Sequence, residues 1–111
     1  MNRSKTIKDT FLRRAADILG KSGYEFTAKK MITFFSDKSF KYDIDIPYST
    51  APLPKGVDNK RNALYENLVK FPSNLQFEII DELCENKLLK DYDDVQEIKQ
   101  LLHERYSSLN S

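Results

Sequence analysis

Prolines divide this 111-residue chain and limit the folds that it can adopt. Three of the four, Pro47, Pro52 and Pro54, lie in one short stretch. A proline interrupts a helix because its ring removes a backbone N–H and clashes with the preceding turn. The sequence therefore predicts a long extended, proline-containing arm over residues 38–57, with helices before and after it. In this arm, Tyr42, Ile44, Ile46 and Tyr48 alternate with Asp43, Asp45 and Pro47, as in an extended segment with one buried face.

Outside the arm, apolar residues recur at intervals of three and four, which is typical of helices that bury one face. No second strand candidate accompanies the arm, so we expect no sheet. The sequence predicts an all-α fold, a compact bundle of about five helices, as a single domain over residues 1–111 or as the N-terminal module of a longer protein. The stripes at Phe11–Leu19, Leu64–Leu68, Ile79–Leu83 and Ile98–Leu102 are expected to share one interior. The expected helices are Ser4–Leu19, Thr27 to Ser36 or Asp37, Asp58 or Asn59 to Phe71, and two that start at Ser73 and Asp93.

Polar residues and glycines mark the expected ends of these helices. Ser73 with Gln76 has the spacing of a capping box, in which each side chain satisfies a backbone N–H near the other. Asp93 is expected to cap the last helix, with Gln96 at its third position. Gly20 and Gly23 are predicted stops for the first helix, because glycine adopts left-handed backbone conformations without a Cβ clash.

The composition favours a cytoplasmic protein. Cys84 is the only cysteine, so an internal disulfide bond is excluded. No stretch reaches the roughly 18–20 apolar residues of a membrane-spanning helix, and residues 1–20 lack the apolar run of a signal peptide. We therefore expect no membrane contact.

The net charge of +1 conceals an asymmetry along the chain. Residues 1–41 carry +6, from ten Lys and Arg against four Asp and Glu, whereas residues 71–111 carry −5, from four basic against nine acidic residues. Two interpretations are open. Two surfaces of opposite sign attract each other within the fold, or a basic face meets an acidic partner.

Residues that could carry catalysis are few. His103 is the only histidine and is interpreted as a surface or boundary residue, and Cys84 falls at core spacing, as a small buried apolar residue would. One Cys and one His cannot fill a tetrahedral zinc site. We therefore expect no enzyme, no metal and no other cofactor.

Two sets of residues are candidates for binding. The first is the alternating face of the arm, Tyr42, Ile44, Ile46 and Tyr48, which combines aromatic side chains with nearby prolines and is a candidate contact surface for a partner. The second consists of three basic pairs on predicted helices, which could contact phosphate or another anion. These pairs are Arg13 with Arg14, Lys29 with Lys30, and Lys60 with Arg61.

A family resemblance covers about half of the chain, from Gly23 to Phe71. Its motif is a Thr-led helix with an aliphatic stripe, a variable loop, a Lys-Arg pair and two leucines four residues apart. In these respects the chain resembles the small helical domain at the N-terminus of AbiJ-like abortive-infection proteins. The resemblance implies a sensing or regulatory module of bacterial phage defence, normally fused to a toxic effector domain. The matching positions are Thr27, Ile32, Lys60, Arg61, Leu64 and Leu68.

The sequence thus supports two functional hypotheses. The first is a non-catalytic interaction or regulatory module, with a protein partner or a fused effector domain. The alternative is a nucleic-acid or nucleotide-binding helical module that uses the basic N-terminal half.

Overall fold

The computed structural model describes residues 6–53 and 60–110, and within these residues it contains helices and no β-strand. Its radius of gyration, 13.4 Å, is close to the ~13 Å expected for a compact chain of this length. The all-helical prediction is confirmed. The helices are α1 (Asp9–Leu19), α2 (Ala28–Tyr42), α3 (Lys60–Leu68), α4 (Ser73–Cys84), α5 (Asp93–Tyr106) and a final 3₁₀ turn, η1 (Ser107–Asn110).

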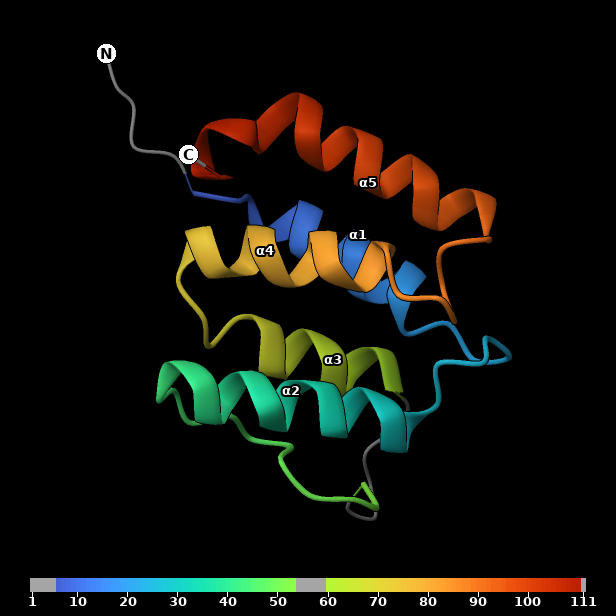
Figure 1. The fold of residues 1–111 in the computed structure, drawn as a ribbon, viewed down its shortest axis with the longest axis vertical. Coiled ribbons are helices and arrows are strands. Elements are labelled where there is room, and N and C mark those ends of the chain that lie inside the picture. The colour runs from blue at the N-terminus through green and yellow to red at the C-terminus, as the bar shows by residue number, and fades with distance from the viewer. Residues whose placement is uncertain (1–5, 54–59, 111) are drawn as a thin grey trace.

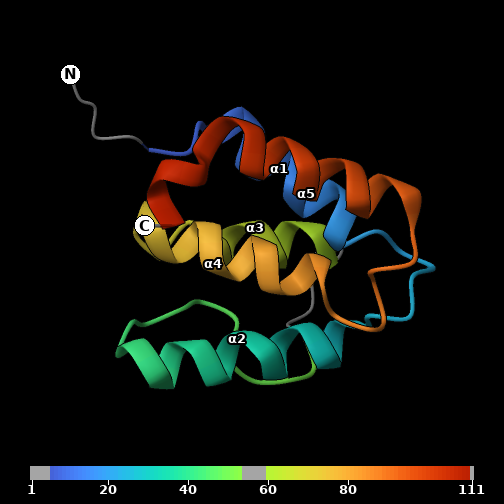
Figure 2. The same ribbon diagram turned by 45° about the horizontal axis from the view of Figure 1, so that its top comes forward.

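The helices form three layers (Figures 1 and 2). Helices α1 and α5 lie on one side, α3 and α4 lie in the middle, and α2 lies on the opposite side. Helix α1 packs mainly on α3, α5 packs mainly on α4, and α2 rests on α3. The outer surfaces of α2 and α5 therefore face away from each other.

The apolar stripes meet between these layers, as the sequence predicts. Phe11 and Leu19 of α1, Leu64 of α3 and Ile80 of α4 all belong to one buried cluster, together with Leu102 of α5. Each of these side chains is at least 95% buried. Removing this apolar surface from water, at roughly 25 cal/mol per Å², is the main term that stabilises the fold.

Helix α2 begins as predicted but ends later. The expected start at Thr27 is confirmed: its hydroxyl accepts a hydrogen bond from the backbone N–H of Lys30, so Thr27 is the N-cap. The predicted end at Ser36 or Asp37 is wrong, because the helix continues to Tyr42 and stops at Asp43, whose φ is +57°. The segment before Asp43 contains neither glycine nor proline, so nothing local ends the helix earlier.

The caps predicted for the last two helices are wrong, although both helices start where expected. Neither α4 nor α5 has a side-chain cap hydrogen bond. In α4, the carbonyl of Pro72 receives the N–H groups of Leu75 and Gln76, and the Gln76 side chain is buried instead of reaching back. In α5, the Gln96 amide donates to the carbonyl of Lys90, so it ties the helix to the preceding turn. Burial in the core thus takes Gln76 out of the capping pattern, and a bond to the preceding turn takes Gln96 out of it.

The arm is not confirmed over its predicted range of residues 38–57. Residues 38–42 form the last turn of α2, Tyr42 included, and residues 54–59, with the expected helix start at Asp58 or Asn59, lie outside the described part of the chain. Residues 43–53, here called the α2–α3 segment, are not helical. Their predicted alternation holds from Asp43 to Tyr48, where exposed residues alternate with half-buried ones.

Candidate functional site

Helices α1 and α3 approach closely because a glycine stands at the end of α1. A Cβ built on Gly20 would lie 2.8 Å from the Cα of Arg61 and 2.9 Å from the carbonyl oxygen of Ala16. Both distances are shorter than real Cβ contacts, so a residue with a side chain does not fit here without moving the backbone. The absence of a side chain at Gly20 thus brings the first turn of α3 against the last turn of α1.

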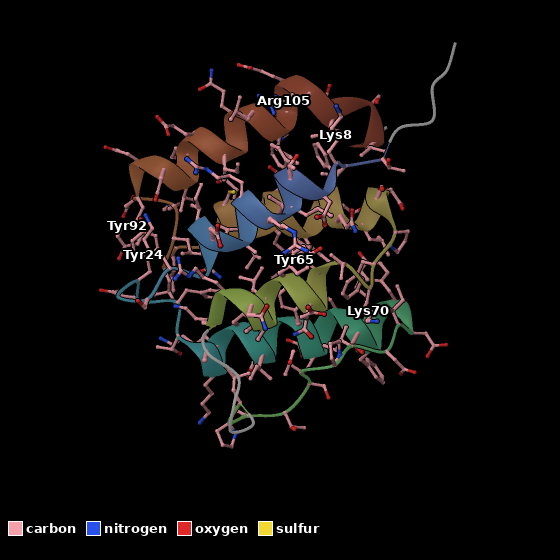
Figure 3. All side chains as sticks on the ribbon, turned by 180° about the vertical axis from the view of Figure 1, so that it is seen from behind. Lys8, Tyr24, Tyr65, Lys70, Tyr92 and Arg105 are labelled. Carbon is pink, nitrogen blue, oxygen red and sulfur yellow. The ribbon has the colours of Figure 1, made fainter. Side chains whose placement is uncertain are left out.

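A groove runs along this contact and is here called the α1–α3 groove. It has a volume of about 330 Å³ and is open to solvent. It brings Arg13 and Arg61, two members of different predicted basic pairs, beside the ring of Tyr65. In Figure 3, Tyr65 lies between α1 and α3. The groove is lined by Arg13, Ala16, Asp17, Arg61, Asn62 and Tyr65.

Arg13 is held in place by two neighbours. Its Nε atom is 2.8 Å from a carboxylate oxygen of Asp9, one helical turn earlier. Its guanidinium carbon lies 4.3 Å from the centre of the Tyr65 ring, a cation–π contact. The Tyr65 hydroxyl donates to the other oxygen of Asp9. Hydrogen bonds from Tyr65 and Arg13 lower the pKa of Asp9, and the bond to Asp9 raises the pKa of Arg13. The three side chains thus form a preordered charged corner of the groove.

Arg61 also lines the groove and is exposed. Within residues 6–53 and 60–110, no carboxylate forms an ion pair with it. The guanidinium group presents several N–H donors in one plane, a geometry that suits phosphate or carboxylate oxygens. Arg61 can therefore donate to a ligand that enters the groove.

The other basic residues predicted as anion contacts do not converge on this groove. Lys60 is half-buried, and its ammonium group donates to the carbonyl of Phe26 just before α2. Burial lowers the pKa of Lys60. Lys29 and Lys30 are exposed at the start of α2, and Arg14 is exposed on α1 outside the groove lining. Of the three predicted basic pairs, the structure thus brings together only Arg13 from the first pair and Arg61 from the third.

The proposed contact residues of the arm point toward the domain. The Tyr42 hydroxyl donates to Glu78 of α4 over 3.0 Å. Ile44, Ile46 and Tyr48 are partly buried and pack against the core. These contacts give the four residues a role in folding, and their contact with a partner stays a prediction.

Asn67 is the residue that the sequence analysis missed in this region. Its side chain is fully buried and makes two hydrogen bonds with the backbone of Tyr48: its Oδ1 accepts from the N–H over 2.9 Å and its Nδ2 donates to the carbonyl over 3.0 Å. An Asn within the apolar spacing of α3 was the available signal, because a buried amide needs partners for both its donor and its acceptor. Asn67 fixes the α2–α3 segment to α3.

The two residues considered for catalysis have structural surroundings. His103 lies 2.7 Å from a carboxylate oxygen of Asp81 and edge-on to the ring of Phe77, at the boundary between core and solvent. Cys84 is buried, and burial raises the pKa of its thiol to about 12. A thiol with that pKa is almost entirely protonated at neutral pH and is a poor nucleophile. Among the residues whose positions the structure gives, no three His, Cys, Asp or Glu side chains gather as metal ligands would.

Ion pairs join the basic and acidic halves of the chain at two places. Lys21 reaches Asp94 of α5 over 2.6 Å, and Lys38 of α2 reaches Glu82 of α4 over 2.5 Å. The interpretation that opposite charges attract each other within the fold is therefore correct for these residues. Other basic residues, Arg61 among them, remain directed to solvent.

Comparison of the chain with protein-family models, with curated proteins and with solved structures finds no match. The resemblance to AbiJ-like domains thus rests on the sequence motif alone. In the described part of the chain, each helix is too short or too polar to cross a bilayer.

Proposed function

We propose that this chain is a non-catalytic binding module that holds the phosphate groups of a nucleic acid in the α1–α3 groove. The observation that carries the proposal is that Arg13 and Arg61, from two different helices, line one groove together with the partly exposed ring of Tyr65. Guanidinium groups donate in pairs to phosphate oxygens, and aromatic rings next to them can stack on bases. The groove supplies both elements.

The charge around the groove supports an anionic ligand. Two arginines and one carboxylate, Asp17, line the groove, and Asp9 beside it is already shared between Arg13 and Tyr65. Three exposed basic residues elsewhere on the domain would add a long-range attraction for phosphate (Figure 3). They are Lys8 before α1, Lys70 after α3 and Arg105 on α5.

The proposal selects between the two hypotheses from the sequence. The apolar residues of the α2–α3 segment pack against the core, so the geometry favours the basic groove over the arm as the main binding surface. The AbiJ-like resemblance adds a context to the proposal, in which the bound nucleic acid would be the signal of a sensing module in phage defence. That context depends on the motif from Thr27 to Leu68 and not on the groove.

Binding of a fluorescein-labelled single-stranded oligonucleotide, measured by fluorescence anisotropy at several salt concentrations, tests the proposal. Arg61→Ala should weaken binding by about tenfold, because a charge-assisted hydrogen bond contributes roughly 1.5–3 kcal/mol. It should also reduce the slope of log affinity against log salt by about one phosphate contact.

The matched control is Arg14→Ala, which removes the same charge from α1 outside the groove lining. Arg14→Ala should lower affinity only slightly, through the loss of long-range attraction. Competition by a mononucleoside triphosphate distinguishes a nucleic acid from a free nucleotide as the ligand. If the triphosphate displaces the oligonucleotide at equal concentration, the ligand is a nucleotide. Equal losses from the two substitutions, or no binding at low salt, would contradict the groove as the site.

A further inference from the structure

The outer surface of α2 carries an aromatic side chain that takes no part in the core. Phe40 is 90% exposed, whereas the other phenylalanines in the described residues are buried or half-buried. An exposed apolar residue by itself is common and needs no explanation. Phe40 becomes informative together with two further features: the charge of the residues around it and the charge of the surface on the opposite side of the molecule.

The exposed residues of α2 lie on one side of the helix because they are spaced by three, four, seven and eight positions. Three of these residues are lysines and one is an aspartate, so Phe40 stands in a surface with a charge of +2. We call this surface the α2 face. Its residues are Lys29, Lys30, Thr33, Asp37, Phe40 and Lys41.

The outer surface of α5 has the opposite character. Asp93, Glu97 and Glu104 are exposed along it, and within the described residues none of these carboxylates forms an ion pair. A shallow hollow of about 390 Å³ lies among Glu97, Gln100, Leu101 and Glu104, with the half-buried Leu101 as its apolar element. We call this surface the α5 face. It offers an apolar spot within a negative surface, as the α2 face offers an apolar spot within a positive one.

The two faces cannot meet within one molecule. Helices α2 and α5 are the outermost elements on opposite sides of the fold, with α3 and α4 between them (Figures 1 and 2). The buried residues of each helix, such as Phe35 of α2 and Ile98 of α5, point toward the middle layer, so the exposed faces point away from it. Only a second copy of the chain can bring an α2 face to an α5 face.

We infer that copies of this chain associate head to tail, with the α2 face of one copy on the α5 face of the next and Phe40 in the hollow beside Leu101. Complementary charge orients the two faces, and burial of an aromatic side chain, which covers about 150–250 Å², provides the apolar contact. Because the interface joins two different surfaces, an open assembly keeps a free α2 face at one end and a free α5 face at the other, and growth continues into a ring or a filament. With one aromatic anchor the contact is weak, so association depends on protein concentration and on salt.

Sedimentation velocity over a range of protein concentrations at low and high salt tests the inference without any ligand. The average mass should rise beyond that of a dimer as concentration increases, and it should fall when salt is added. Phe40→Glu should weaken association by about 30-fold, the effect of losing a central anchor. Because Phe40 is exposed, the circular dichroism spectrum and the thermal melt of the Phe40→Glu variant should match those of the wild type. Full association of Phe40→Glu, or a wild-type monomer at every concentration, would refute the interface.

A mixing experiment distinguishes head-to-tail association from a symmetric dimer. Phe40→Glu keeps its α5 face, and a Glu97→Lys, Glu104→Lys double variant keeps its α2 face. Each variant alone should stay monomeric, and an equimolar mixture should form a one-to-one heterodimer that does not grow further. Glu66→Lys on α3 serves as a control for charge reversal outside both faces. If the double variant still self-associates, the contact joins two α2 faces and the head-to-tail arrangement is wrong.

Discussion

Two of the connections without helix in the described residues are fixed by different means. The α1–α2 connection (residues 20–27) is held by charged and hydroxyl side chains near solvent. The α2–α3 segment is held by neutral groups: the buried amide of Asn67 bonds the backbone of Tyr48, and the hydroxyls of Ser36 and Ser39 donate to the carbonyls of Ser49 and Ile44. Both attachments join parts of the chain that are distant in sequence. The comparison shows that the anchors of two connections can differ in how much they stabilise the fold and in whether that stabilisation depends on pH.

The anchor of the α1–α2 connection is Asp94 of α5. One carboxylate oxygen accepts from Lys21 over 2.6 Å and the other accepts from the hydroxyl of Tyr24 over 2.7 Å. The ring of Tyr24 stacks on Tyr92, with 3.6 Å between the ring centres, and both lie at the edge of the molecule (Figure 3). Partial burial raises the pKa of Asp94, but the hydrogen bonds from Lys21 and Tyr24 outweigh it, and the pKa is lowered overall. This anchor is ionic and titratable.

The main anchor of the α2–α3 segment is the uncharged side-chain amide of Asn67, which is buried. Asn67 makes the hydrogen bonds that water would otherwise make with the N–H and the carbonyl of Tyr48, as the neighbouring strand of a sheet would. Such a pair of bonds adds little in water but is costly to lose inside the fold, because the backbone groups are left without partners. The buried amide should therefore contribute more to stability than the exposed ion pair.

The largest effect is expected for Asn67→Ala. The substitution leaves both Tyr48 backbone groups unsatisfied and opens space in the interior, so the free energy of unfolding should fall by about 3 kcal/mol. Chemical denaturation followed by circular dichroism measures it. Asn74→Ala, at an exposed position of α4, is the control and should change stability by less than about 0.5 kcal/mol. Equal effects of the two substitutions would mean that the Tyr48 attachment does not stabilise the fold.

A smaller effect is expected for Gly20→Ala, at the start of the α1–α2 connection. The added methyl group would meet the backbone of Arg61, so α3 must shift and the free energy of unfolding should fall by about 2 kcal/mol. Gly23→Ala is the matched control. Gly23 has open space around it and φ of +95°, so its substitution should cost only about 1 kcal/mol, through backbone strain. The reverse order in thermal melts would contradict the close contact of α1 and α3.

The smallest effect is expected for Asp94→Asn, and it depends on pH. Because the folded state lowers the pKa of Asp94 below its usual value of 3.8, the carboxylate stabilises the fold above that value. The contribution disappears as the pH falls through the lowered pKa. At neutral pH the substitution should cost about 0.5–1 kcal/mol, as for a partly exposed ion pair. Melts of the two proteins should converge in strong acid. A difference that stays constant from neutral to acidic pH would show that the charge is not involved.

Several features of this fold were readable from the chain. The spacing of Leu64 and Leu68 predicts a buried helix face, and the start of a helix at Thr27 was also expected, because both depend on residues within one or two turns. The alternation from Ile44 to Tyr48 also predicts which side chains turn inward. The site was only partly readable, since the basic pairs were visible but not the one pairing that forms a groove.

The order of residues along the chain determined that the protein is helical, where its apolar stripes lie and which half is basic. These properties follow from local spacing and composition, so they need no knowledge of distant contacts. Only the tertiary structure decided that Arg13 meets Arg61, that Asn67 binds the backbone of Tyr48 and that Gln76 is buried instead of capping α4. The physical reason is that a groove, a buried hydrogen bond and an exposed Phe40 depend on which helices pack together, and packing joins residues that local patterns do not connect.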